Sequence, residues 1–457
     1  MCTDRKTLAP IMAMEPMTLD IDDVPSLPLQ GQFRLGVTGD LIYLRPMAAT
    51  LKAQRPDLVK ELLSTDVLIG NLETVLLELD TFSGSPQAQS GGTWMLADPA
   101  VAADLKSLGF SILGLANNHA TDWGVEALLG TREHLDAAGI QHAGAGRSMS
   151  QARSACYVDA PQGRLGFLAA SATFTPMSPA ADPLGRVPGR PGINTLRTTP
   201  YSAVNPADYE RLAGLAETTF SGNVIREGSL KLMGGEFEPD ASVPEGSSRL
   251  EYRVEERDAQ EILRQVRQAK QNSSLVVFGF HYHEPANAAQ EPAAFAAEFS
   301  RRVVDAGADV VVSHGPHQLR GIELYKGAPI FHSLGNFAMM TNSLDSVPRE
   351  TYDLYGLSPE EATVPELLSA RNAAVFGKPE MSESVFPVLE YREGRLTSVE
   401  LVPLDIAPDI GAALGTPAKA DEEKSSAILQ RLQNLSAPFG TFFTSTAGRT
   451  FLDLAKT

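Results

Sequence analysis

The chain has 457 residues, and its composition of 43% hydrophobic and 21% charged residues is that of a globular protein with a buried core. This length accommodates about two or three average domains, or one large α/β unit with insertions. The formal net charge of −18 excludes the broad basic surface that nucleic acids and anionic membranes require, although a local pocket for an anionic substrate is compatible with it.

Residues 1–32 are rich in Met, Asp and Pro without periodicity, and we interpret them as an N-terminal arm. Their apolar piece, 8–15, is too short and interrupted for a signal-peptide core, and no later stretch reaches the length of a membrane span. Cys2 and Cys156 are the only cysteines, which favours two reduced thiols, with a single disulfide as the alternative. We therefore expect a cytoplasmic protein without a membrane span.

From residue 33 onward, short apolar runs alternate with helical patterns of roughly 10–15 residues. Runs typical of strands cover 33–38, 67–69, 111–115, 164–170, 275–280 and 309–313. This alternation predicts βαβ crossovers and largely parallel pairing, so we expect an α/β core over 33–345. A segment rich in Ser, Gly and Gln, 80–96, is expected to form a loop beside the site.

Two other regions depart from this rhythm. Pro and Gly cluster in 172–255, which we interpret as an insertion and a candidate lid over the site. The last region, 346–457, is expected to complete the core with an antiparallel hairpin, 384–404, and a helix near 421–434.

Polar side chains gather where the predicted strands end. They are Asp40, Glu73, Asn118 with His119, His281 with His283, and His314 with His317. In an open parallel sheet the carboxyl ends of the strands meet at one edge, so these loops should converge on one site. Mixed Asp, Glu, Asn and His ligands suit Mn²⁺, Fe²⁺ or Zn²⁺, and a bridging carboxylate can hold two such ions. We therefore expect two divalent metal ions.

Several of these residues also have simpler interpretations. His314 and His317 could form a hydrogen-bonded pair at a strand end, and Asp40 could be a turn residue after a glycine. Glu73 could be a solvated loop charge, and Asn118 could belong to a turn.

The other histidines and two loop arginines complete the candidates. His134 and His142 are expected to be ordinary polar residues, and His332 is expected to be part of the core or to lie behind the metal ligands. Arg190 and Arg197 could clamp a substrate carboxylate, since arginine binds carboxylates with two hydrogen bonds, or could be solvated loop residues.

A string of motifs resembles the bacterial capsule-synthesis CapA (poly-γ-glutamate) family, a branch of the calcineurin-like metallophosphoesterase superfamily. The motifs are Gly39-Asp40, Asn71-Leu72-Glu73, 116–124, Gly144-Ala145-Gly146, 313–317 and 333–337. The resemblance covers roughly residues 33–340 and implies a four-layer αββα sandwich with a dinuclear metal site. It assigns one metal to Asp40, Glu73 and His317, and the other to the bridging Glu73 with Asn118, His281 and His314.

The resemblance also gives His119 the role of the superfamily's acid/base histidine. The chain departs from the pattern at Ile42, where superfamily members usually have a histidine, so the first metal would have fewer ligands. The usual His-Trp-Gly is His281-Tyr282-His283 here, so His283 either adds a ligand or acts as a second acid/base group. A membrane anchor, normal for members that assemble capsules, is not evident in the sequence.

Three functions are consistent with these observations. The resemblance implies a metal-dependent hydrolase acting on poly-γ-glutamate or a related acidic peptide. The alternative on the same scaffold is a peptide epimerase of ribosomal-peptide tailoring, in which two acid/base groups exchange a Cα proton. The third is a capsule or polyglutamate assembly protein that retains a structural metal site without catalysis.

Overall fold

The computed structural model describes residues 28–219, 225–226, 228–344, 346–376, 378–406 and 415–455. Residues 1–27, most of the predicted N-terminal arm, lie outside the described residues. Across the described ranges, no helix combines the length and the apolarity needed to cross a membrane.

The larger of the two main sheets is built around its first strand. Its order is β22-β23-β20-β19-β1-β2-β3-β4, with β18 beside β1 and β21 beside β20. The strands are β1 Gln32–Ile42, β2 Val67–Leu72, β3 Phe110–Gly114, β4 Gln141–Ala143, β18 Asn336–Met339, β19 Glu383–Arg392, β20 Arg395–Asp405, β21 Ala418–Lys419, β22 Phe443–Thr446 and β23 Arg449–Leu452. β2 pairs in parallel with one edge of β1. The opposite edge pairs antiparallel with β19, which forms a hairpin with β20, and further along in parallel with β18.

The smaller main sheet has the order β16-β17-β15-β14-β7-β6. Its strands are β6 Cys156–Ala160, β7 Gly163–Ser171, β14 Leu275–His281, β15 Val310–His314, β16 Ile322–Tyr325 and β17 Ala328–Phe331. The four inner strands pair in parallel, and the two edge strands are antiparallel to their neighbours.

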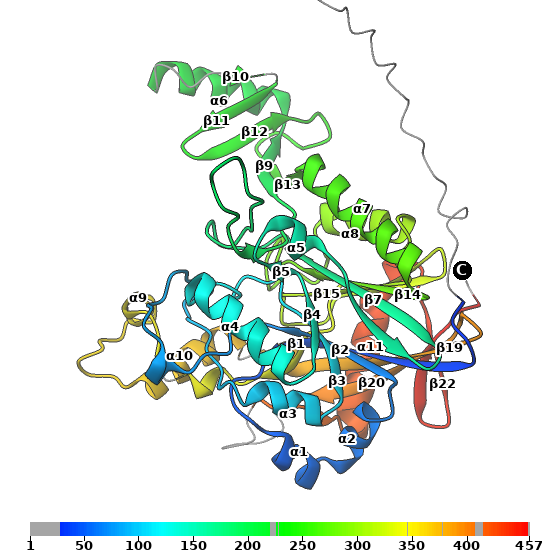
Figure 1. Cartoon of the computed structure of the whole chain (residues 1–457). Coiled ribbons are helices and arrows are strands. Elements are labelled where there is room, and N and C mark those ends of the chain that lie inside the picture. Colours follow the sequence, from blue (N-terminus) through cyan, green and yellow to red (C-terminus); the bar gives the residue numbers. More distant parts are fainter. Residues whose placement is uncertain are drawn as a thin grey trace, which may run out of the picture.

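The two sheets pack face to face, and helices cover their outer surfaces (Figure 1). Helices of the larger-sheet side are α1 Ala48–Gln54, α2 Pro56–Leu62, α3 Val101–Ser107, α4 Gly124–Ala137 and α11 Glu422–Ser436. Helices α7 (Glu256–Asn272) and α8 (Ala294–Asp305) cover the smaller sheet. This arrangement is the four-layer αββα sandwich that the family resemblance implies.

Helix α7 illustrates how the sequence places these layers. Its apolar residues recur at the helical spacing and are buried against the smaller sheet. They are Ala259, Ile262, Leu263, Val266 and Ala269. Strand β14 is buried at every position, because helices lie on one face of its sheet and the larger sheet lies on the other.

Within 172–255, most of the chain forms a small separate sheet beyond α7 and α8, at the top of Figure 1. Its elements are β9 Thr198–Val204, α6 Pro206–Thr219, β10 Ile225–Arg226, β11 Ser229–Leu232, β12 Gly235–Pro239 and β13 Ser248–Val254. Before it, β5 (Ala145–Gly146) pairs with β8 (Gly192–Ile193), and α5 (Met149–Arg153) follows β5. The Tyr252 and Phe295 rings, with centroids 5.2 Å apart, connect β13 to α8.

Strand β1 continues four residues beyond the predicted end at residue 38. The alternating pattern ends before Gly39-Asp40, and glycine usually weakens a strand. Here a Cβ on Gly39 would lie 2.1 Å from the carbonyl oxygen of Gly335, so glycine permits the close approach of β18. As a result, Asp40 lies within the sheet, paired with Asn336 on one side and with Asn71 on the other.

Candidate metal centre

The predicted strand-end residues converge on one site between the two sheets. Asp40 lies near the end of β1, and Glu73 follows the last residue of β2. His281 and His314 are the last residues of β14 and β15 and are partners in the ladder between these strands. Two groups of three residues could each hold a metal ion, because the ligand atoms within each group lie within 4.8 Å of one another. The groups are Asp40, Glu73 and His281, and Glu73, His283 and His317.

Glu73 is the residue that most clearly indicates a cation. Its side chain is fully buried, and neither carboxylate oxygen has a hydrogen-bond partner among the described residues. The Nε2 atoms of His281 and His317 lie 3.8 and 3.9 Å from Oε1. Burial raises the pKa of Glu73 well above its usual range, and the charge of Asp40 raises it further. A divalent ion would satisfy both oxygens and offset the cost of burying the charge, so these residues fit a metal.

Asp40 is held in place by hydrogen bonds. Oδ1 accepts from Asn71 Nδ2 at 2.9 Å, and Oδ2 accepts from the Gly315 backbone N–H at 3.0 Å. The Nδ1 atom of His317 is 3.5 Å from Oδ2. Burial alone would raise the pKa of Asp40, but the hydrogen bond from His317 and the charges of the surrounding histidines hold it well below its usual range.

Burial disfavours the charged form of three imidazoles around this carboxylate pair. Burial lowers the pKa of His281 well below the ordinary value, lowers that of His283 to about 3, and also lowers that of His314. Neutral imidazole is the form of histidine that binds metal ions.

His283 is oriented as a metal ligand would be. Its Nδ1 donates to Asn287 Oδ1 at 2.6 Å, which directs the lone pair of Nε2 into the site. That Nε2 lies 3.1 Å from Nε2 of His281. The geometry is therefore compatible with both roles that the sequence leaves open for His283, ligand and acid/base group.

His314 and Asn118 occupy the flanks of the site. His314 donates from Nε2 to the Thr38 carbonyl at 3.1 Å, so Nδ1 is the atom that could bind a metal. Asn118 Oδ1 lies 2.8 Å from His281 Nε2, and its Nδ2 donates to Ser90 Oγ at 2.8 Å.

His119 is paired with a buried carboxylate. Its Nδ1 is 2.7 Å from Asp122 Oδ2, and the same oxygen accepts the Met95 backbone N–H at 2.7 Å. Asp122 is fully buried and thereby fixes the orientation of the imidazole. This contact engages Nδ1 and leaves Nε2 as the ring nitrogen that does not face Asp122.

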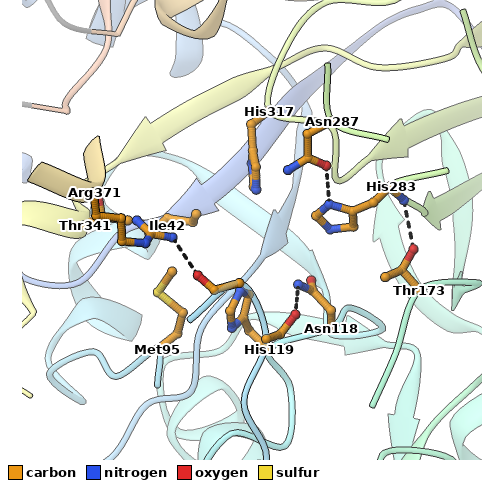
Figure 2. A pocket seen from close by; sticks show the side chains of 12 residues that line it. Ile42, Met95, Asn118, His119, Thr173, His283, Asn287, His317, Thr341 and Arg371 are labelled. Carbon is orange, nitrogen blue, oxygen red and sulfur yellow. Dashed lines mark hydrogen bonds between the residues drawn. The ribbon is translucent and has the colours of Figure 1, made fainter. Parts of the chain in front are cut away.

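A cavity of about 200 Å³ opens beside these residues (Figure 2). It is lined by Ile42, Ser90, Gly91, Met95, Asn118, His119, Thr173, His283, Asn287, His317, Thr341 and Arg371. Three of them, Ser90, Gly91 and Met95, belong to the predicted loop 80–96 beside the site. From the region interpreted as a lid, Thr173 lines the cavity, and the separate sheet contributes none of the lining residues. The role of that region as a lid stays a prediction.

The two candidate arginines lie elsewhere. Arg190 donates from Nε to the Pro179 carbonyl at 2.9 Å. Arg197 binds both carboxylate oxygens of Asp258, at 2.6 and 3.1 Å. Neither arginine is among the described residues that line the cavity, and their substrate-binding role stays a prediction.

The side chains that orient the candidate ligands are not among the residues predicted from the sequence. Asn71 and Asn336 stand within the recognised motifs, and Asn336 Oδ1 accepts from His317 Nδ1 at 3.0 Å. Asp122 is also within a recognised motif, so its spacing from His119 could have indicated the pair. Asn287 and Arg371 lie outside the motifs, and no sequence pattern marks them. His332 is buried and lies 3.3 Å from Glu323, in agreement with the expected core position.

Comparisons with known proteins were consistent with one family. Residues 34–341 match the model described as bacterial capsule synthesis protein PGA_cap. The protein y4sH of Sinorhizobium fredii is 38% identical over 425 residues, which span 90% of this chain and 91% of that protein. The PGA biosynthesis protein CapA of Bacillus subtilis is 27% identical over 51% of this chain and 43% of its own length. A probable polyglutamine synthesis accessory protein of Mycobacterium tuberculosis is 27% identical over 61% of this chain and 57% of its own length.

Proposed function

The chain belongs to the bacterial capsule synthesis protein PGA_cap family, and from this premise we propose that it is a metal-dependent hydrolase of an acidic peptide or of poly-γ-glutamate. The observation that carries the proposal is the buried Glu73 carboxylate, which lacks hydrogen-bond donors within the described part of the chain and lies among the histidines His281, His283 and His317. A cluster of metal-binding side chains next to a cavity is a typical arrangement for metal-dependent hydrolysis.

Two divalent ions, Mn²⁺, Fe²⁺ or Zn²⁺, would be held by side chains from both sheets. The residues are Asp40, Glu73, Asn118, His281, His314 and His317, with His283 as a further ligand. Ions held there would supply Lewis-acid chemistry, polarising a carbonyl or phosphoryl oxygen and lowering the pKa of water.

His119 would supply the proton in this reaction. Asp122 accepts the hydrogen bond from Nδ1, so Nε2 is the atom that exchanges a proton with the substrate. Because His119 lines the cavity, a leaving group bound there would be within reach of that atom. The role of Asp122 is to orient the imidazole and to stabilise its protonated form.

Turnover by the metal-loaded protein tests the proposal. Poly-γ-glutamate and a generic phosphodiester would each be incubated with wild type, His119→Ala and His134→Ala. His134, on α4, is the matched control because it is not among the described residues that line the cavity. We expect turnover of poly-γ-glutamate by wild type and the control, with a loss of about 100-fold or more in His119→Ala. If wild type cleaves neither substrate, the hydrolase proposal is wrong.

An epimerase is the second candidate, and one observation favours it. His119 and His283 both line the cavity and come from different sheets, so two imidazoles could act on one substrate carbon (Figure 2). An epimerase would incorporate deuterium at a peptide Cα in heavy water without cleaving the chain. Deuterium incorporation that requires both histidines would support this candidate over hydrolysis.

An assembly role without catalysis is the third candidate. The Mycobacterium tuberculosis relative bears the name of an accessory protein of polymer synthesis. If His119→Ala and His317→Ala both leave every activity unchanged while metal content stays at the wild-type level, this candidate is favoured.

A further inference from the structure

Arg371 forms part of the cavity wall opposite the metal ligands. It lies on α10 (Val364–Phe376), and its side chain lines the same cavity as His119, His283 and His317 (Figure 2). Arg371 is 5% exposed. Its guanidinium donates from Nη2 to the Gly91 carbonyl and from Nη1 to Asn372 Oδ1, both at 3.2 Å.

The charges around the cavity favour an anionic ligand. Among the described residues that line it, the ionisable side chains are three histidines and Arg371, and no carboxylate is present. Burial lowers the pKa of Arg371, which reflects the cost of removing its charge from water. An anion bound against the guanidinium would offset that cost, and arginine binds carboxylates with two parallel hydrogen bonds.

The size of the cavity limits how much of a polymer can enter. Its volume of about 200 Å³ is below the range of roughly 300–1,000 Å³ that drug-sized ligands occupy. One residue of an acidic chain would therefore enter, with its carboxylate against Arg371 and its peptide bond toward the metal ligands. Ile42 and Met95 add apolar surface for the methylene groups of such a residue.

We propose that Arg371 determines substrate specificity by binding the carboxylate of the substrate residue that enters the cavity. This inference rests on the proposed function, because it names the acidic group that the hydrolase recognises. The family model matches residues 34–341, so α10 lies outside the matched part of the chain. Specificity would therefore be set by a segment added to the shared catalytic core.

Binding measurements separate this inference from the hydrolase proposal. The protein loaded with Mn²⁺ would be titrated calorimetrically with a γ-linked glutamate trimer and with the same trimer carrying carboxamides in place of its α-carboxylates. The variants are Arg371→Gln and Arg371→Lys, with Arg264→Gln on the outer surface of α7 as the matched control. Inorganic phosphate serves as a competing anion.

We expect wild type and Arg264→Gln to bind the acidic trimer about 10- to 100-fold more tightly than the amide, the usual value of a hydrogen bond to a charged group. Arg371→Gln should bind both trimers equally, and Arg371→Lys should retain part of the preference. If Arg371→Gln fails to fold, Arg371→Lys decides, because lysine keeps the charge but loses the planar fork.

Three results would overturn the inference. Wild type could bind the acidic and amide trimers equally, or the preference for the acidic trimer could survive in both Arg371→Gln and Arg371→Lys. The third result is that Arg371 affects the binding of phosphate but not the binding of the acidic trimer. Arg371-dependent binding of a trimer that is never cleaved would support it while contradicting the hydrolase proposal.

Discussion

Replacing Arg320 should release the loop that carries His283. Arg320 is fully buried and lies over the Tyr282 ring at 5.4 Å. It donates to four backbone carbonyls of one loop, those of His283, Glu284, Ala286 and Ala289, at 2.9 to 3.4 Å. The loop of 283–289 has no regular secondary structure, so these bonds take the place of a ladder of backbone hydrogen bonds.

The expected loss of stability follows from the backbone carbonyls that Arg320→Met would leave without a hydrogen-bond donor. Each hydrogen bond to a charged group contributes about 1.5–3 kcal/mol, and each orphaned buried carbonyl costs about 1–3 kcal/mol, although such terms do not add. Methionine fills most of the space and avoids burying the guanidinium, which offsets part of the loss. We expect the free energy of unfolding to fall by about 3–5 kcal/mol.

Two measurements check this expectation. Urea denaturation gives the change in the free energy of unfolding, and metal analysis of the folded protein reports whether His283 still contributes to the site. Arg264→Met on the surface of α7 is the matched control and should change stability by less than about 0.5 kcal/mol. If Arg320→Met unfolds within about 1 kcal/mol of wild type and keeps its metal, the carbonyl bonds do not hold the loop.

Other predictions follow from the same physical reasoning. Glu73→Gln should reduce the metal content while making the metal-free protein more stable, since a neutral amide costs less to bury than a carboxylate; metal analysis and thermal melts with and without chelator check both effects. A metal-free Glu73→Gln protein less stable than metal-free wild type would contradict this reasoning. For Asp258, burial tends to raise the pKa, but hydrogen bonds from Arg197 lower it overall. The ion pair between Asp258 and Arg197 should contribute roughly 1 kcal/mol to the free energy of unfolding, because it is partly exposed. This contribution should be fully present above the pKa of about 3.9 that aspartate has in the unfolded chain. It should be lost as the pH falls through the lower pKa of the folded protein. Denaturation of wild type and Asp258→Asn at pH 6 and pH 3 should show the difference shrinking on acidification, and an equal difference at both pH values would refute the assignment. Gly315→Ala should destabilise the site, because Gly315 has φ 116° and a Cβ would lie 2.7 Å from the Tyr282 carbonyl. The metal content and the melting temperature of Gly315→Ala check this expectation, and wild-type values for both would contradict it.

Local patterns could predict the α/β core and the strand ends that form most of the candidate site, and the family resemblance implied the four layers. Buried strands such as β14 appear as continuous apolar runs, and the polar residues that follow them can only gather at one edge of a parallel sheet. The recognised motifs then placed Asp40 and Glu73 beside the histidines.

Features that depend on tertiary contacts could not be predicted in this way. The orientation of His283 is set by Asn287, and the nitrogen that His314 offers is set by the Thr38 carbonyl. Arg371 reaches the cavity from a helix that follows the matched core, and a lone arginine carries no periodic signal. The strands of the small separate sheet are short and half-exposed, so β13 shows no clear alternation of apolar and polar residues.

The central position of β1 has a consequence for biosynthesis. This strand is synthesised well before its neighbours β18 and β19, which begin about 300 and 350 residues later, at Asn336 and Glu383. Until those strands are synthesised, the edge of β1 opposite β2 stays unpaired, and such an edge can pair with other chains. Metal uptake should therefore follow completion of the chain, and nascent chains should depend on chaperones up to that point.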